Sequence, residues 1–267
     1  MNLKHKRVLL TGATGGIGQA LCHQLVAAGC HLILVGRSQT KLDQLIEQLP
    51  DKSNYLSIEA DIGCAEGIKK INKECKLYIN EGIDIDIVIN NAGCNTFDYL
   101  TQRSIVSIEQ EIAVNISAPI LLSKYALAWL QPNGIIVNIG STFAAIGYPG
   151  YATYCATKAA LHRFTEAMQR ELQGTNKKML FIAPRATNTS LNEQRVTNLN
   201  KALGNSMDSP ELVAKQVLQT LLTEQRMHWM GWPEKLFVRI NQLFPSLVAN
   251  SINKQHSIIT KSLTSTH

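Results

Sequence analysis

The sequence has no cysteine or histidine pattern typical of a metal site or a disulfide framework. Its six cysteines form no C-x-x-C pair and have no histidine at ligand spacing: Cys22, Cys30, Cys64, Cys75, Cys94 and Cys155. Most therefore fit the role of small apolar side chains in a reducing cytoplasm. We expect no metal site.

Long hydrophobic runs are also missing. The first seven residues are largely polar and basic, and the apolar run after them covers only residues 8–10. We expect neither a signal peptide nor an uncharged apolar run long enough to span a bilayer, which takes roughly 20 residues. The net charge of +6 comes from scattered residues, which does not indicate a nucleic-acid partner. The sequence therefore predicts a cytoplasmic protein.

Apolar strand patterns and helical patterns alternate along most of the chain. This alternation predicts a parallel sheet with helices on both faces, a doubly wound α/β fold. With 267 residues, of which 45% are hydrophobic, one domain suffices. We expect a single Rossmann-type domain over residues 1–230 and a C-terminal helical extension over 231–267. Strands are predicted at residues 8–11, 31–35, 55–60, 85–89, 134–141 and 179–183, with a last edge strand at 227–230.

Local signals place some helix ends and loops. Ser107 and Gln110 have the spacing of a capping box that opens a helix. Ser209 and Pro210 predict the start of another helix, because Pro is favoured at the first helical position. Residues 185–207 are polar and loop-like, and their length is typical of a lid.

A glycine-rich turn follows the first strand: Thr11-Gly12-Ala13-Thr14-Gly15-Gly16-Ile17-Gly18. Glycines between a strand and a helix let the backbone approach a pyrophosphate, whose charge then lies at the helix N-terminus. The position after the first strand and before the first helix is the context that such a site needs.

A tyrosine and a lysine four residues apart begin the helix after the fifth strand. Tyr154 and Lys158 share one helical face. A phenol has an ordinary pKa of about 10, and a neighbouring ammonium lowers it and makes the tyrosine a usable acid or base. Ser141 ends the preceding strand, where its hydroxyl could hold a carbonyl oxygen.

With Asn90-Asn91-Ala92-Gly93, Asn115, Ser141, Tyr154 and Lys158 in this order, the chain resembles the short-chain dehydrogenase/reductase family over residues 6–230. Gly12, Gly16 and Gly18 match the spacing of this family. Gly12, Gly15 and Gly18 match that of the longer epimerase and dehydratase relatives, but 267 residues leave little room for their separate substrate domain.

The resemblance implies site residues and their roles. Tyr154 would exchange a proton with the substrate oxygen, Lys158 would lower its pKa and hold the nicotinamide ribose, and Ser141 would position that oxygen. Asn115 would support a water-linked proton path to the lysine. The residues expected to bind the cofactor are Gly12, Thr14, Gly16, Ile17, Gly18, Arg37, Asp61, Ile62, Asn90, Tyr154, Lys158, Thr187 and Thr189.

The end of the second strand bears on the choice of cofactor. A carboxylate there would bond the ribose 2′-hydroxyl of NAD and repel the 2′-phosphate of NADP. The chain has Gly36-Arg37 instead, with no acid until Asp43, and a guanidinium suits a phosphate. We therefore expect NADP(H).

Three features leave alternatives open. Arg185 follows Pro184 where the family usually has Gly, and it would either reshape the nicotinamide pocket or contact an anionic substrate. Tyr151 lacks a lysine four residues later and is expected to line the substrate pocket. The extension carries an apolar helical stripe and four Lys or Arg against one acid, which suits subunit packing, a membrane surface or a guard for an acyl-chain pocket. Its stripe comprises Leu236, Phe237, Ile240, Leu243 and Phe244.

The sequence as a whole predicts an NADPH-dependent carbonyl reductase or alcohol dehydrogenase. A small, hydrophobic substrate and a homodimer or homotetramer would follow from the resemblance. Two alternatives remain: a 3-oxoacyl-thioester reductase, and a non-catalytic nucleotide-binding regulatory or scaffold protein. Intact Asn115, Ser141, Tyr154 and Lys158 disfavour the last of these.

Overall fold

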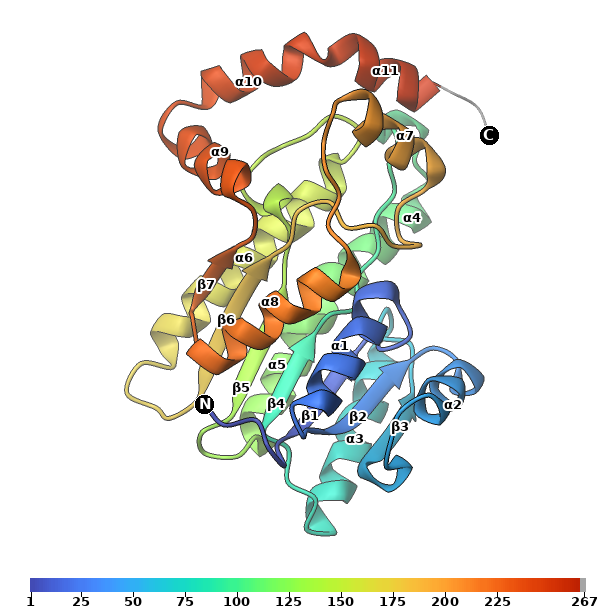
Figure 1. Ribbon diagram of the computed structural model, residues 1–267, viewed down its shortest axis with the longest axis vertical. Helices are drawn as coiled ribbons and strands as arrows, with labels where there is room; N and C mark the ends of the chain where they lie inside the picture. The colour runs from blue at the N-terminus through green and yellow to red at the C-terminus, as the bar shows by residue number, and fades with distance from the viewer. Residues whose placement is uncertain (265–267) are drawn as a thin grey trace.

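The computed structural model describes residues 1–264, apart from the side chains of residues 233 and 234. Within this range seven parallel strands form one sheet in the order β3-β2-β1-β4-β5-β6-β7 (Figure 1). The predicted doubly wound parallel sheet is confirmed. The strands are β1 (Arg7–Thr11), β2 (His31–Gly36), β3 (Tyr55–Glu59), β4 (Ile87–Asn90), β5 (Ile135–Ile139), β6 (Lys178–Ala183) and β7 (Met227–Trp229).

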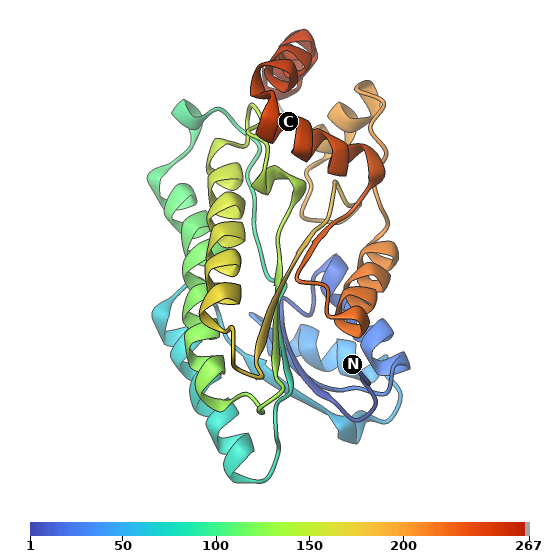
Figure 2. The same cartoon turned by 90° about the vertical axis from the view of Figure 1, so that its left-hand side faces the viewer.

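Helices cover both faces of the sheet (Figure 2). One face packs against α1 (Gly16–Ala27), α2 (Gln39–Glu47) and α8 (Pro210–Thr223). The other packs against α3 (Ala65–Asn80), α5 (Ala118–Trp129) and α6 (Ala152–Glu171). Because both faces are buried, the strands are almost continuously apolar, as parallel sheets require.

The strand order reverses between β1 and β4, which lie side by side at the centre of the sheet. In doubly wound sheets, ligands bind outside the carboxyl ends of the strands at this switch point. The loops after β1, β4, β5 and β6 meet there.

Two helix starts test the capping signals that were predicted from the sequence. Ser209 caps α8 as predicted, because its hydroxyl accepts from the Leu212 amide at 3.2 Å. The predicted capping box at Ser107 is wrong: α4 (Ile105–Ile112) begins earlier, and Ser104 accepts from the Ser107 amide at 3.2 Å. Both serines have the right chemistry, and the Ser107 hydroxyl instead accepts a hydrogen bond from Arg103.

A chain of buried amides and hydroxyls crosses the centre of the fold. Asn90 on β4 donates to Asn138 on β5 at 2.8 Å, and Asn138 donates to Thr165 on α6 at 2.8 Å. Thr165 donates in turn to the Leu161 carbonyl. All three linked side chains are buried, and each hydrogen-bonds within the chain, as buried polar groups must.

The segment predicted as a loop-like lid contains a helix, α7 (Gln194–Ala202). Val196 and Leu199 give it a buried side, a helical spacing hidden among polar neighbours. The extension is helical as predicted and continues through α9 (Trp232–Leu243), α10 (Pro245–Lys254) and α11 (His256–Thr264). Residues 265–267 of the predicted extension lie outside the described residues. The division into two parts at residue 230 stays a prediction.

One stretch, Ile105–Trp129, is long and apolar enough for a membrane span by length and composition, with a mean hydropathy of 1.4. It comprises α4, a π-helical turn (Ala113–Ser117) and α5. Ala118, Leu122 and Ala126 of this stretch are buried in the core against the sheet. This stretch therefore supplies part of one helical layer of the domain.

Candidate active site

A cavity of about 880 Å³ lies at the carboxyl ends of the strands. Its walls come from the glycine-rich turn after β1, the loops after β2 to β6, the start of α6, the segment around α7, and α9 and α10. It contains nearly all of the residues predicted as site residues from the sequence: Gly12, Thr14, Gly16, Ile17, Gly18, Arg37, Asp61, Ile62, Ser141, Tyr154, Lys158, Thr187 and Thr189.

The glycine-rich turn is tight and closely packed. Gly12 has φ +65°, and a Cβ there would lie 2.8 Å from the Ala92 Cα atom. A Cβ on Gly18 would lie 2.1 Å from the Gly12 carbonyl oxygen. Gly15 is the N-cap of α1, and Gly16 is its first residue. This open helix N-terminus is a cradle that fits the pyrophosphate of a dinucleotide.

Beyond β2 the cavity wall carries two cations and one carboxylate. Arg37 lies there with Lys41, which is in the first turn of α2 and also on the cavity wall. Lys41 was not among the site residues predicted from the sequence, because Arg37 precedes the N-cap Ser38 and no helical spacing links the two. Asp61 and Ile62 line the same region, and an Asp61 carboxylate oxygen accepts from the Gly63 amide at 2.9 Å. Two cations at this end suit a phosphate better than a neutral hydroxyl.

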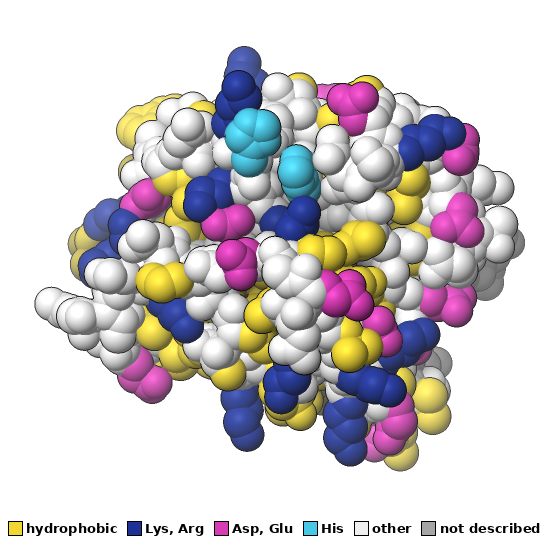
Figure 3. Space-filling view, turned by 90° about the horizontal axis from the view of Figure 1, so that it is seen from below, with side chains coloured by type: hydrophobic (Ala, Val, Ile, Leu, Met, Phe, Trp, Pro, Cys, Tyr) yellow, Lys and Arg dark blue, Asp and Glu magenta, His cyan; other side chains and the backbone are white. Residues whose placement is uncertain are grey.

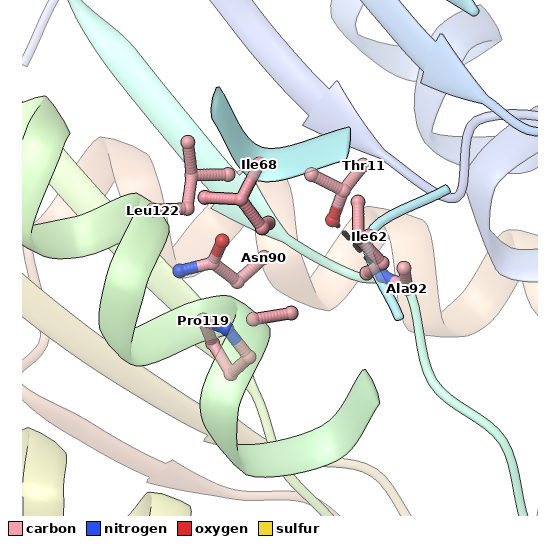
Figure 4. Close-up of a pocket in the computed structure, with 8 residues that line it drawn as sticks. Thr11, Ile62, Ile68, Asn90, Ala92, Pro119 and Leu122 are labelled. Atoms are coloured by element: carbon pink, nitrogen blue, oxygen red, sulfur yellow. Dashed lines mark hydrogen bonds between the residues drawn. The ribbon is translucent and has the colours of Figure 1, made fainter. Parts of the chain in front are cut away.

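Asn90, predicted to lie beside the cofactor ribose, does not line the large cavity. Its amide points into the core among Ile68, Pro119 and Leu122 (Figure 4). The hydrogen bond to Asn138 holds it there. Asn91, Ala92 and Gly93 line the cavity instead, because the chain leaves the sheet after Asn90.

Ser141, Tyr154 and Lys158 converge as predicted from the sequence. Ser141 follows β5, and Lys158 reaches back to donate to the Ile139 carbonyl at 3.1 Å. The Lys158 ammonium lies 5.6 Å from the centre of the Tyr154 ring. These three groups lie on a single wall of the cavity.

The pKa of Tyr154 is not lowered, as the neighbouring Lys158 would predict, but raised. Burial raises the pKa of Tyr154, and an interaction with the Ser141 hydroxyl acts in the opposite direction. Burial also lowers the pKa of Lys158 to about 8, because the ammonium loses its hydration. In this protein, desolvation therefore outweighs the expected effect of the lysine on the tyrosine.

Asn115 ties two segments together behind the site. It lies in the π-helical turn, where its carbonyl oxygen accepts from the Cys94 amide at 3.0 Å. Its amide donates to the Cys94 carbonyl at 2.8 Å and to Thr157 on α6 at 3.1 Å. A Cβ on Gly93 would lie 3.3 Å from the Asn115 oxygen and 3.6 Å from the Lys158 nitrogen. Both polar groups therefore meet at Gly93.

A buried ion pair lies one helical turn before Asn115. Arg103 pairs with Glu111, and the two side chains are only 4% and 1% exposed. Arg103 also donates to the Ser107 carbonyl and hydroxyl at 2.9 and 2.7 Å. The pair fastens the loop after β4 to α4. Nothing in the sequence pattern indicated it, because the two residues are separated by a helix start.

The segment after β6 closes over the cavity. Arg185 donates to Asp208 at 2.6 Å, so it is held by a carboxylate of its own chain. Thr189 packs on the glycine-rich turn, since a Cβ on Gly16 would lie 2.8 Å from its methyl group. Thr187 is buried, and its hydroxyl donates to the Arg185 carbonyl at 2.9 Å.

The far end of the cavity is lined by aromatic, aliphatic and uncharged polar side chains. Tyr151 lies there as expected, packed against Phe97, Phe143 and Tyr154. The extension adds side chains whose role in the wall the sequence left open: Phe237, Val248, Ser251, Ile252 and Gln255.

Comparison with known proteins agrees with this geometry. Residues 6–200 match the family model of short chain dehydrogenases. A 3-oxoacyl-[acyl-carrier-protein] reductase of Rickettsia felis is 30% identical over 244 residues, 86% of this chain and 98% of that protein.

Solved structures share the fold. A short-chain dehydrogenase/reductase of Burkholderia phymatum, in complex with NAD, superposes with a TM-score of 0.81 at 16% identity, over 92% of this chain and 96% of that one. A short-chain dehydrogenase of Burkholderia cenocepacia, in complex with NADP, gives 0.77 at 20% identity, over 94% and 99%. Because the family model matches most of this chain, the chain belongs to the short-chain dehydrogenase/reductase family.

Proposed function

We propose that the protein is an NADP(H)-dependent oxidoreductase that interconverts a carbonyl and an alcohol. The observation that carries this proposal is the convergence of Ser141, Tyr154 and Lys158 on one wall of a cavity that begins at the glycine-rich turn. Structural relatives in complex with NAD and with NADP support a nicotinamide dinucleotide.

The residues present fit such a cofactor. The turn from Gly12 to Gly18 would take the pyrophosphate at the N-terminus of α1. Arg37 and Lys41 would take the 2′-phosphate, which favours NADP(H) over NAD(H). Asp61 and Ile62 would flank the adenine, and Lys158, Thr187 and Thr189 the nicotinamide end. When bound, the cofactor supplies or accepts the hydride.

The chain's own groups handle the proton. The Tyr154 hydroxyl is the acid in reduction and the base in oxidation, and it exchanges its proton at the substrate oxygen. Ser141 holds that oxygen by a hydrogen bond. Lys158 provides a cation that favours the phenolate, and Asn115 fixes the loop against which the Lys158 nitrogen lies. Burial raises the pKa of Tyr154 in the free protein, which opposes the effect of the lysine cation.

The apolar side chains that line part of the cavity favour a hydrophobic substrate. Beyond Tyr154 the wall includes rings and aliphatic side chains such as Tyr148, Tyr151 and Val196, together with hydroxyls and amides such as Ser251 and Asn200. Apolar surface of this kind binds hydrocarbon groups. The similarity to a 3-oxoacyl-[acyl-carrier-protein] reductase supports a second candidate, reduction of a 3-oxoacyl thioester.

We also propose that the protein is a cytoplasmic homodimer or homotetramer.

Turnover of ketones, aldehydes and 3-oxoacyl thioesters with NADPH tests this function. Tyr154→Phe should lower turnover by about 10²–10⁴-fold, the usual contribution of a positioned acid or base, and should leave cofactor affinity nearly unchanged. Tyr151→Phe is the matched control, since it removes a phenol from the same cavity wall. Equal effects of the two substitutions, or turnover that survives both, would contradict the proposed role of Tyr154. A protein that binds NADPH but reduces no carbonyl would be the non-catalytic alternative.

A further inference from the structure

The extension is fixed to its own chain by one side of each helix. On α9, Val238 is only 3% exposed, and Asn241 donates to the Ala145 carbonyl at 2.8 Å. On α10, Val248 is buried, and on α11, Ile259 and Leu263 pack in the apolar cluster around Phe97 and Tyr151. The inner side of the extension is therefore a wall of the active-site end of the domain.

The opposite side of α9 is apolar and exposed. Trp232, Leu236 and Leu243 are 76%, 49% and 72% exposed. Spacings of four and seven residues place them on one helical face, away from Val238. Phe244 and Leu247 continue the exposed apolar surface at the turn into α10, at 58% and 59%. We call Trp232, Leu236, Leu243, Phe244 and Leu247 the outer tail face.

Two exposed cations, Lys235 and Arg239, flank the outer tail face on α9. Residues 231–267 contain four Lys or Arg against the single acid Glu234. The opposite end of the molecule differs, because acidic and basic side chains are interspersed there (Figure 3). An apolar face flanked by cations is the pattern of a helix that lies at an anionic lipid surface.

The same charges disfavour a second copy of this chain as the occupant. In a symmetric dimer, each partner would present the same patch, so a patch with the two exposed cations Lys235 and Arg239 would meet an identical patch. Like charges at an interface oppose association. Anionic headgroups would instead neutralise them while the apolar side chains enter the acyl boundary.

The outer tail face also adjoins the cavity. Phe237 on α9 and Val248 and Ile252 on α10 line the cavity wall, so the two helices have one side toward the cavity and the other toward solvent. Both helices lie at the end of the molecule toward which the strands point (Figures 1 and 2).

We propose that the outer tail face docks on the surface of an anionic phospholipid bilayer and places the cavity mouth at that surface. Residues 232–247 expose six large apolar side chains, more than any separate stretch of this length in residues 1–264, and all of them except Phe237 belong to the outer tail face. No span is implied, since α9 and α10 are each far shorter than a bilayer-crossing helix. Delivery of a hydrophobic carbonyl compound from the bilayer would follow, and that consequence alone rests on the proposed function.

Co-sedimentation of the full chain with vesicles tests the docking. Vesicles of phosphatidylcholine alone are compared with vesicles of about three parts phosphatidylcholine to one part phosphatidylglycerol, at about 0.1 M and about 1 M salt. We expect binding to the anionic vesicles at low salt and a loss of at least tenfold at high salt. Lys235→Glu/Arg239→Glu should weaken binding at least tenfold, since each exposed cation contributes about a fivefold gain near an anionic surface. Leu236→Ser/Leu243→Ser should abolish it.

Ile105→Ser/Val106→Ser is the matched control, because these α4 side chains are 74% and 73% exposed but lie outside the outer tail face. It should bind vesicles like the unmodified protein. Light scattering and NADPH titration of every variant separate loss of docking from loss of assembly or folding. Absence of vesicle binding by the unmodified protein overturns the docking, as does an equal loss in the control. A third result would also overturn it: the unmodified protein binds no vesicles, and Leu236→Ser/Leu243→Ser dissociates an oligomer. The outer tail face would then be a subunit interface. Turnover of a water-soluble ketone reports on the proposed reaction separately.

Discussion

Arg185 joins the two ends of the segment that covers the cavity, because its guanidinium donates to Asp208, 23 residues later, over 2.6 Å. Thr187 also pairs with Asp208 through an isolated backbone bridge. From the sequence alone, an arginine where the family usually has glycine would either reshape the nicotinamide pocket or contact an anionic substrate. In the structure its guanidinium fastens the segment, and it also lines the cavity.

Replacing Arg185 with Met should loosen this segment. The Asp208 side chain is 4% exposed and that of Arg185 is 23% exposed, so the loss should be about 1–3 kcal/mol, between the values for surface and buried pairs. Hydrogen exchange over residues 185–208 should rise, and cofactor affinity should fall with it. Arg163→Gln, which breaks an exposed pair on α6, is the control and should change stability by less than about 1 kcal/mol. Unchanged exchange over the segment would show that Arg185 does not fasten it.

Arg37 and Lys41 should determine the preference for NADP(H). Arg37→Asp should weaken NADPH binding relative to NADH by about 10–100-fold, since a charged hydrogen bond is worth about 1.5–3 kcal/mol and the new carboxylate would repel the phosphate. Lys41→Ala should have a smaller effect in the same direction. Fluorescence titration of both cofactors measures the ratio, with Lys76→Asp on the exposed side of α3 as the control. Tighter binding of NADH by the unmodified protein would contradict the assignment.

Lys158 should make stability depend on pH in a defined window. Its pKa is lowered from 10.5 to about 8 in the folded protein. Between these values the unfolded chain binds a proton that the folded chain lacks, so stability rises with pH. Relative to Lys158→Met, the free energy of unfolding should therefore increase by about 3 kcal/mol between pH 7.5 and 10.5.

Urea unfolding at several pH values measures this difference. Lys124→Met, on the exposed side of α5, is the matched control for removal of a lysine ammonium. If the Lys158→Met difference were flat with pH, the pKa of Lys158 would not be lowered in the folded protein.

Glu111 should be structurally essential despite its distance from the glycine-rich turn. Glu111→Gln leaves the buried Arg103 cation without its carboxylate, which should cost about 3–5 kcal/mol. Glu109→Gln, exposed on the same helix, should stay within about 0.5 kcal/mol. The double variant Arg103→Met/Glu111→Leu removes both charges and should recover much of the loss. Thermal and urea unfolding of the four proteins decide this, and a loss below about 1 kcal/mol in Glu111→Gln would contradict it.

The fold could be predicted because its evidence is local and repeated. Alternation of apolar strands with helices determines a parallel sheet, and every predicted strand is present with small differences at its ends. The Tyr154 and Lys158 pair could be predicted for the same reason, since four residues on one helix fix their proximity.

What could not be predicted depends on contacts between distant segments. Asn90 and Asn91 are neighbours in sequence, yet only their place relative to β5 decides which one faces the cavity. The Arg103–Glu111 pair and the Arg185–Asp208 pair each cross a loop whose path no periodicity describes. The effect of burial on the pKa of Tyr154 is likewise a property of the packed core around it.

The buried chain of Asn90, Asn138 and Thr165 has a consequence for how the strands align. Asn90 and Asn138 are direct partners in the pairing of β4 with β5. A slip of one residue would place Asn90 opposite the apolar Val137 or Ile139 and leave both amides without each other in the core. A slip of one residue turns every side chain of a strand to the other face, and both faces of this sheet are otherwise apolar at these strands. This pair of amides thus penalises misalignment of β4 and β5, and it fixes the relative positions of Asn91 and Ser141, which follow the ends of these two strands.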